Sequence, residues 1–302
     1  MPDITIEQAI YSNQGSSSYQ LRARSPGFLD EWLAEAERLC VEFGERPAGV
    51  ACSECLFAQP FIKRHVAVVQ VADRGRPDAL GFHFLILPRS AYLNLGGDPF
   101  LLAERFPADW SARDPLPVLS LEEATLPRRT VQELAAALQG PEAGPTLLGG
   151  AQALVDGGHL VFLRPAPDKA LVRNLWLLLP TTTRADLWPA TFAFSNQLLF
   201  DAVVAPPAAG EAFAGHLTEQ QAGDYPEGYY ERNLQMAVEA GDQHELDALL
   251  ARRSRKETWR LGWILVIVIG LLVVVGNLLT PPPTRPAPDG KHKVEQRSPA
   301  KK

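Results

Sequence analysis

One long apolar stretch of the sequence, residues 261–279 with the letters LGWILVIVIGLLVVVGNLL, contains no charged residue and strongly limits how this chain can fold. An α-helix rises about 1.5 Å per residue, so 19 residues span roughly 28 Å, close to the ~30 Å hydrocarbon core of a bilayer. Buried strands are usually about 4 to 8 residues long, and helices of soluble proteins keep a polar face. The stretch therefore predicts one C-terminal transmembrane helix.

The residues that flank this stretch predict its orientation. Trp259 and Trp263 lie near its start, and tryptophan favours the lipid headgroup region. The basic residues before the stretch are Arg252, Arg253, Arg255, Lys256 and Arg260. Fewer basic residues follow it, and the N-terminus lacks the pattern of a secretory signal. Because cytoplasmic flanks carry an excess of Lys and Arg, we expect a cytoplasmic N-terminal domain and a short C-terminal tail on the other side.

Charge is distributed unevenly along the chain. The formal net charge is −6, but residues 252–302 contain 11 Lys or Arg and only 3 acidic residues, which leaves the first 251 residues near −14. Proteins that bind nucleic acid usually present a basic surface. The sequence therefore argues against nucleic acid as a partner, and the basic flank suits anionic lipid headgroups.

Apolar patterns in the first 205 residues predict an α+β domain with a mixed or antiparallel sheet and packed helices. Residues 4–11 and 19–23 alternate around a turn, which predicts a hairpin. Residues 65–72 and 80–87 are apolar at nearly every position and predict two neighbouring strands buried on both faces. We expect helices over 30–43 with Asp30 as the N-cap, and over 98–106, 130–138 and 169–179. Strands are further expected at 159–163 and within 190–205, and the three prolines in 108–127 favour a loop.

Composition divides the remainder of the chain into segments. Residues 206–228 are rich in Pro, Ala and Gly and predict a linker. Residues 229–256 repeat apolar positions around Gly241 and Asp242, which predicts a helical hairpin beside the membrane. Residues 280–302 are proline-rich and basic, so we expect a disordered tail.

The common nucleotide, metalloprotease and serine-hydrolase motifs are missing from the sequence, and no cofactor site is predicted. The three cysteines are too few for a secreted disulfide framework. Cys52 and Cys55 form a CxxC pair that has a structural, a metal-binding and a redox interpretation. A zinc site would have to recruit Cys40 and His65, at spacings unlike those of zinc fingers. Buried structural thiols are the favoured interpretation.

Two arginines form a possible partner-binding site. Arg22 and Arg24 are two residues apart in a predicted strand, and this spacing places side chains on one face. The pair could bind an acidic partner or a phosphate, although arginines at this spacing also occur on any solvent-facing strand.

Two segments of the sequence resemble parts of a known family. The opening IEQAIYSNQGSSSYQLRARSPGF and the later LWLLLPTTTRADLWPATFAFSNQ are similar to segments in the N-terminal domains of GTPase-associated proteins of bacterial conflict systems. The resemblance covers about residues 4–204. It implies a noncatalytic domain that works with a GTPase, and it implies no catalytic residues. A membrane span after the domain departs from that family's usual build.

These observations leave three hypotheses open. The first is a noncatalytic adaptor anchored in the bacterial inner membrane that presents a protein-binding domain, with a GTPase or another conflict-system component as the candidate partner. The second is an enzyme of unrecognised type, with Cys52, Cys55 and His65 or His83 around a pocket that could contain zinc. The third is a function of the basic tail outside the membrane.

Overall fold

The computed structural model describes residues 4–13, 18–74, 79–111, 113–122, 127–139, 143–251, 266–270 and 272. Residues 1–255 form one compact unit and residues 256–302 form a second. The α+β class with a mixed sheet and packed helices is confirmed. The strands are β1 (Ile4–Ser12), β2 (Gln20–Arg24), β3 (Cys55–Phe61), β4 (His65–Asp73), β5 (Leu80–Pro88), β6 (Leu119–Leu121), β7 (Leu160–Leu163), β8 (Pro189–Ala190), β9 (Ala202–Ala205) and β10 (Leu217–Thr218).

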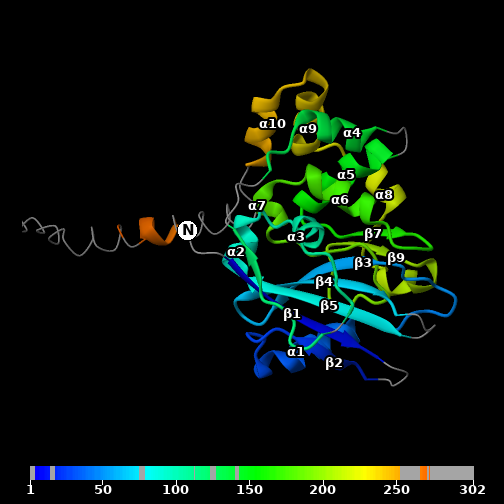
Figure 1. The fold of residues 1–302 in the computed structure, drawn as a ribbon. Helices are drawn as coiled ribbons and strands as arrows, with labels where there is room; N and C mark the ends of the chain where they lie inside the picture. The colour runs from blue at the N-terminus through cyan, green and yellow to red at the C-terminus, as the bar shows by residue number, and fades with distance from the viewer. Residues whose placement is uncertain are drawn as a thin grey trace, which may run out of the picture. The chain divides into compact units, whose positions relative to one another are not determined.

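Helices connect these strands and cover the sheet. They are η1 (Asp30–Trp32), α1 (Leu33–Glu42), α2 (Arg89–Asn94), α3 (Pro99–Arg105), α4 (Val131–Leu138), α5 (Ala143–Val155), α6 (Lys169–Leu178), α7 (Thr181–Arg184), η2 (Pro207–Phe213), α8 (Glu219–Gly223), α9 (Tyr229–Ala240) and α10 (Gln243–Leu250). In Figure 1 the helices α4, α5, α6, α8, α9 and α10 gather on one side of the sheet, and α1 lies on the opposite side.

One sheet contains two halves of different strand direction. Its order is β10-β7-β9-β8-β3-β4-β5-β1-β2, and β6 pairs with the first residues of β1. The strands from β3 to β2 are antiparallel, whereas β10, β7, β9 and β8 run parallel to one another. The predicted hairpin is β1–β2, and the predicted central pair is β4–β5, whose side chains are buried on both faces.

Helix α1 covers one face of the antiparallel half. Phe43, at its end, stacks on Phe57 of β3 with ring centroids 5.3 Å apart, and Trp32 meets the edge of Phe61 at 5.7 Å. The expectation that Asp30 caps this helix is wrong. The chain enters α1 through the 3-10 turn η1, and the Asp30 carboxylate pairs with Arg24 instead.

The other face of the antiparallel half is covered by α3 and the segment that follows it. Gln70 of β4 donates from Nε2 to the carbonyl oxygens of Ala103 and Phe106, at 3.3 and 3.1 Å. The predicted helix over 98–106 is confirmed as α3, and Asp98 caps it by accepting from the amides of Phe100 and Leu101. The prolines around β6 do not prevent a short strand, because β6 pairs along the edge of β1.

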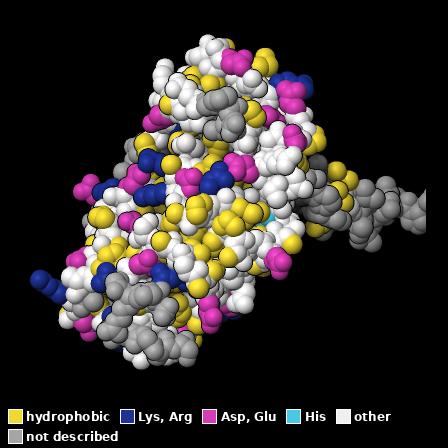
Figure 2. All heavy atoms as spheres, turned by 90° about the vertical axis from the view of Figure 1, so that its right-hand side faces the viewer, with side chains coloured by type: hydrophobic (Ala, Val, Ile, Leu, Met, Phe, Trp, Pro, Cys, Tyr) yellow, Lys and Arg dark blue, Asp and Glu magenta, His cyan; other side chains and the backbone are white. Residues whose placement is uncertain are grey.

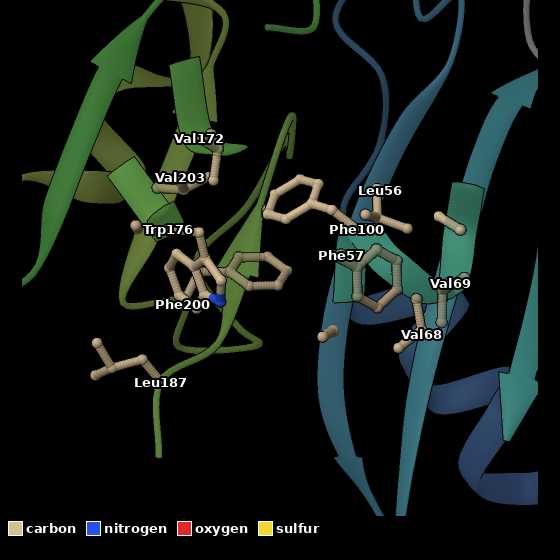
Figure 3. Close-up of a cluster of buried hydrophobic side chains, with 14 of the residues drawn as sticks. Leu56, Phe57, Val68, Val69, Phe100, Val172, Trp176, Leu187, Phe200 and Val203 are labelled. Atoms are coloured by element: carbon tan, nitrogen blue, oxygen red, sulfur yellow. The ribbon is translucent and has the colours of Figure 1, made fainter. Parts of the chain in front are cut away.

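The two halves of the sheet share one apolar core. Figure 3 shows Trp176 of α6 beside Phe200, next to Val203 of β9, with Phe57 and Phe100 across from them. The Phe57 and Phe200 ring centroids lie 5.8 Å apart, and both rings are fully buried. Trp176 Nε1 donates to the carbonyl oxygen of Gly97 at 3.0 Å. Burial of this core therefore joins the antiparallel strands to the helices over the parallel strands.

The expected linker over 206–228 is not seen, and the boundary expected after residue 205 falls within the first compact unit. This segment folds as η2, β10 and α8, with Phe213 and Ala222 almost fully buried. Helix α8 approaches α5 so closely that a Cβ on Gly149 would lie 2.0 Å from the Ala222 carbonyl oxygen. The segment is therefore part of the folded unit and does not act as a linker.

The predicted hairpin is confirmed as α9 and α10, joined at Gly241 with a φ of +68°. It belongs to the first unit, within which the Tyr230 hydroxyl donates to the carbonyl oxygen of Leu178 at the end of α6. In the second unit, residues 266–270 and 272 are helical and their apolar side chains are exposed. Within the described part of the chain, every helix is too short or too polar to span a bilayer. The rest of 261–279, the flanking residues 252–260 and the tail 280–302 lie outside the described residues.

Candidate functional site

The cysteines predicted as a possible reactive or metal site are buried. Cys40, Cys52 and Cys55 are free thiols, and the Sγ atoms of Cys52 and Cys55 are 3.6 Å apart. Burial raises the pKa of the Cys40 and Cys55 thiols well above the ordinary value. Because the thiolate is the form that attacks or binds metal, these two thiols are in an unreactive setting.

The structure does not bring the histidines to the cysteines. His65 pairs with Phe61 at the far end of β3, six residues from Cys55, which corresponds to roughly 20 Å. His83 is in register with Gln70 and Leu56, so its side chain lies on the sheet face opposite to that of Cys55. Among the described residues, no group of three or more His, Cys, Asp or Glu side chains could hold a metal ion. The Cys/His grouping required by the enzyme hypothesis is therefore absent from these residues.

The two arginines of β2 have partners within the domain. Arg22 Nε donates to Ser12 Oγ at 2.9 Å, and Arg24 Nη1 lies 2.5 Å from Asp30 Oδ1. A β-bulge opposite this segment also shifts the register between Ile10 and Tyr11. Arg24 is therefore already neutralised by a carboxylate. The predicted membrane-flanking residues Arg252, Arg253, Arg255, Lys256, Trp259, Arg260 and Trp263 lie outside the described part of the chain.

A cavity of about 440 Å³ that sequence reasoning missed lies among α3, α4, α6, α7 and α10, and we call it the arginine pocket. Its size is within the range of ligand sites, roughly 300 to 1,000 Å³. Its wall combines the apolar side chains of Phe100, Leu101 and Leu250 with a set of charged ones. The charged wall residues are Asp98, Arg128, Arg129, Glu133, Arg173, Arg184 and Asp247.

Arg129 is fixed at the wall by three hydrogen bonds to neutral oxygens. Its Nη1 donates to the carbonyl oxygens of Leu177 and Leu179 at 2.9 and 2.5 Å, and its Nη2 donates to Thr181 Oγ1 at 2.8 Å. Burial, with a further contribution from the positive charge of Arg184, lowers the pKa of Arg129 to about 9. The site thus destabilises the positive charge of this guanidinium.

Arg184 is almost fully buried, with 3% of its surface exposed. Its Nη1 lies 3.1 Å from Asp98 Oδ2, whereas its Nε is buried and has no hydrogen-bond partner. Burial is the main reason that the pKa of Arg184 is lowered. The pocket therefore holds the buried guanidinium of Arg184, the partly buried guanidinium of Arg129 and the buried carboxylate of Asp98.

The remaining charges around the pocket are paired near the surface. Arg128 binds Asp247 of α10, and Arg173 Nη1 lies 2.5 Å from Glu104 Oε1. Such exposed pairs contribute little to stability, about 0 to 1 kcal/mol each. On the face drawn in Figure 2, basic and acidic side chains likewise lie next to one another across the middle.

An open groove of about 650 Å³ continues from the pocket between α4 and α6, and we call it the α4–α6 groove. Ala136, Ala137 and Ala170 line it, and it shares Glu133, Arg173 and Leu177 with the arginine pocket. The pocket and the groove together make a continuous, mixed-charge surface with small side chains. Such a surface has room for a segment of another chain.

The chain matches no protein-family model, and no curated protein is significantly similar to it. The residues of the arginine pocket come from five helices and the segments beside them, spread between residues 98 and 251. Within the sequence, the adjacent arginines of PRRT before α4 are the only local sign of the site. The proximity of Arg129 to Arg184 depends on tertiary structure, and no sequence spacing would reveal it.

Proposed function

We propose that this chain is a noncatalytic adaptor, anchored in the bacterial inner membrane, whose cytoplasmic domain binds a protein partner along the α4–α6 groove. The observation that carries the proposal is the continuity of the arginine pocket with this groove. The pocket gives the groove an end that favours negative charge, because guanidinium groups bind oxyanions strongly. The alanine-lined groove can hold the adjoining segment.

The proposed anchor is residues 261–279. Its described part, residues 266–270 and 272, is helical and exposes Val266, Ile267, Val268, Ile269 and Leu272. Five consecutive helical residues cover every side of a helix, so this segment offers an apolar surface all around. A bilayer is the environment that suits such a surface. The similarity of residues 4–204 to GTPase-associated domains makes a GTPase the first partner to test.

Photo-crosslinking in cells that express the full chain tests the binding surface. A photoreactive residue replaces Ala136 or Ala170 in the groove, and a control replaces Ala240, which is equally exposed but lies on α9. We expect one protein partner to be crosslinked from the two groove positions and not from the control position. Equal crosslinking from all three positions, or none from the groove, contradicts the proposal.

Membrane attachment is tested separately. Extraction of membranes with alkaline carbonate should leave the full chain in the pellet and release a variant that lacks residues 261–279.

A cysteine introduced by Ser298→Cys should react with an impermeant thiol reagent added outside intact inner-membrane spheroplasts. Labelling only after the membrane is permeabilised would contradict the proposed orientation, because it would place the C-terminal tail on the cytoplasmic side.

A further inference from the structure

Arg129 differs from most arginines in the described part of the chain, which are paired with carboxylates. Examples are Arg38 with Glu35 and Glu42, and Arg164 with Glu219. Among the described residues, no carboxylate lies within ion-pair distance of Arg129. The Leu177 and Leu179 carbonyls that it contacts belong to the last turn of α6, whose helix dipole supplies only about half a negative charge.

The acidic groups around the pocket already have partners. Asp98 binds Arg184 and caps α3, and Asp247 binds Arg128 and Gln243. Glu133 Oε2 accepts from the amide of Thr130 at 2.8 Å in the capping box of α4. The partly buried positive charge of Arg129 therefore has no counter-ion within the described protein. Withdrawing a charge from water without a counter-ion is costly, so a bound anion would be favourable here.

We propose that the arginine pocket binds one oxyanion of the phosphate class, with Arg129 and Arg184 as donors. Three of the five N–H donors of Arg129 are used in the hydrogen bonds described above, which leaves two. Arg184 also lines the cavity, and its Nε is buried without a partner, so its guanidinium is not fully hydrogen-bonded within the protein. Both guanidinium groups are planar, and phosphate oxygens are well matched to such groups. The cavity of about 440 Å³ has room for the ligand.

The sharpest test supplies the pocket with its own carboxylate. Thr181 Oγ1 accepts from Arg129 and lines the pocket, so Thr181→Asp places an acidic group beside this guanidinium. We expect at least a tenfold loss of affinity for inorganic phosphate, measured by isothermal titration calorimetry on the detergent-solubilised full chain. The thermal midpoint without phosphate should rise or stay unchanged, because the carboxylate replaces the missing anion. The matched variant Thr181→Val removes the hydroxyl without adding charge, so the tenfold loss is counted relative to this variant and reports the added carboxylate alone.

A second variant removes the donor itself. Arg129→Gln should also weaken phosphate binding at least tenfold, and Arg232→Gln, which breaks an exposed ion pair with Glu227, should leave it unchanged. Thr181→Asp keeps the test decisive if Arg129→Gln fails to fold. Wild-type affinity in a folded Thr181→Asp protein, or no phosphate binding by the wild type at constant ionic strength, overturns the inference. Crosslinking from the groove does not depend on this result, so the adaptor proposal can fail or stand by itself.

The phosphate group can belong to a soluble molecule or to a lipid headgroup. The full chain in nanodiscs of phosphatidylcholine is compared with the chain in nanodiscs that contain phosphatidic acid. A weaker apparent affinity for inorganic phosphate in the second case identifies the headgroup as the ligand by competition. Equal affinity in both assigns the pocket to a soluble phosphate compound.

Discussion

At the scale of single residues, His83 shows how burial fixes a protonation state. Gln8 uses its amide nitrogen to donate to the Pro117 carbonyl oxygen, so its Oε1 accepts from His83 Nε2 at 2.8 Å. The Nδ1 atom of His83 is buried without a partner. Burial lowers the pKa of His83 from 6.5 to about 4, and the nearby carboxylate of Asp109 opposes this shift. The neutral imidazole is therefore the stable form in the fold.

This shift predicts a loss of stability in acid. Between pH 6.5 and pH 4 the unfolded chain binds a proton at His83 and the folded chain does not, so the free energy of unfolding falls as the pH falls. The shift corresponds to about 3 kcal/mol. His83→Gln, which keeps a donor for Gln8, should lose correspondingly less over this window in urea unfolding of residues 1–255. The exposed His244→Gln variant serves as the control, and an identical pH profile for His83→Gln and wild type would contradict the assignment.

The candidate site shows which residue roles the sequence can reveal. The cysteines and histidines attracted attention as residue types, yet strand register places Cys55 far from His65 and on the opposite face from His83. Arg129 and Arg184 carry no local pattern, because their meaning comes from the carbonyl oxygens and the carboxylate that the fold brings to them. Side-chain chemistry is readable from a sequence only where the partners lie nearby in the chain.

At the scale of elements, Gly97 marks a close approach between two helical segments. Its φ is +64°, and a Cβ there would lie 2.6 Å from the backbone nitrogen of Ala185, just after α7. Its carbonyl oxygen also accepts from Trp176 of α6. The turn between α2 and α3 therefore requires a residue without a side chain.

Gly97→Ala should be strongly destabilising, by about 3 kcal/mol, because it adds backbone strain and a clash with backbone atoms that cannot move independently. Gly157→Ala is the matched control, since Gly157 has a φ of +91° but no atom within 4 Å of the added Cβ. This control should cost about 1 kcal/mol, from the left-handed conformation alone. Chemical denaturation of both variants measures the difference, and equal losses would show that crowding at Gly97 is relieved.

Element prediction succeeded where an apolar pattern was long. Strands β4 and β5 and the helix α6 have such patterns and were predicted within a residue or two. Strands β8 and β10 contain two residues each, which is too short for any periodicity. Helix α5 includes Gly149, which allows the contact with α8 but disguises the helix in the sequence. The positions of β8, β10 and α5 therefore depend on packing against neighbouring elements, which the apolar pattern of the sequence does not show.

At the scale of the whole molecule, the segment after residue 205 is part of the first unit. Strand β10 extends the sheet beside β7, and α8 packs on α5. The hairpin α9–α10 adds a further layer, in which Tyr230, Leu234 and Leu246 are buried. The domain is therefore complete only near residue 251.

A fragment of residues 1–205 should accordingly be unstable. It would expose the apolar faces of α4 and α5 that α8 and α9 cover, so we expect aggregation or the loss of a cooperative thermal transition. Residues 1–255 should unfold cooperatively and resist limited proteolysis. A soluble 1–205 fragment with a thermal midpoint close to that of 1–255 would restore the domain boundary that composition suggested.

The junction at β8 has a consequence for how the sheet opens. Strand β8 pairs with β3 at one residue pair, Phe57 with Ala190, supported by bonds of 2.8 Å between Leu56 and Thr191. Few backbone hydrogen bonds therefore cross between the antiparallel and parallel halves, and the aromatic core carries most of the contact (Figure 3). Amide hydrogen exchange should then divide along this line, with β3, β4 and β5 protected as one cooperative unit and β7 and β9 as another.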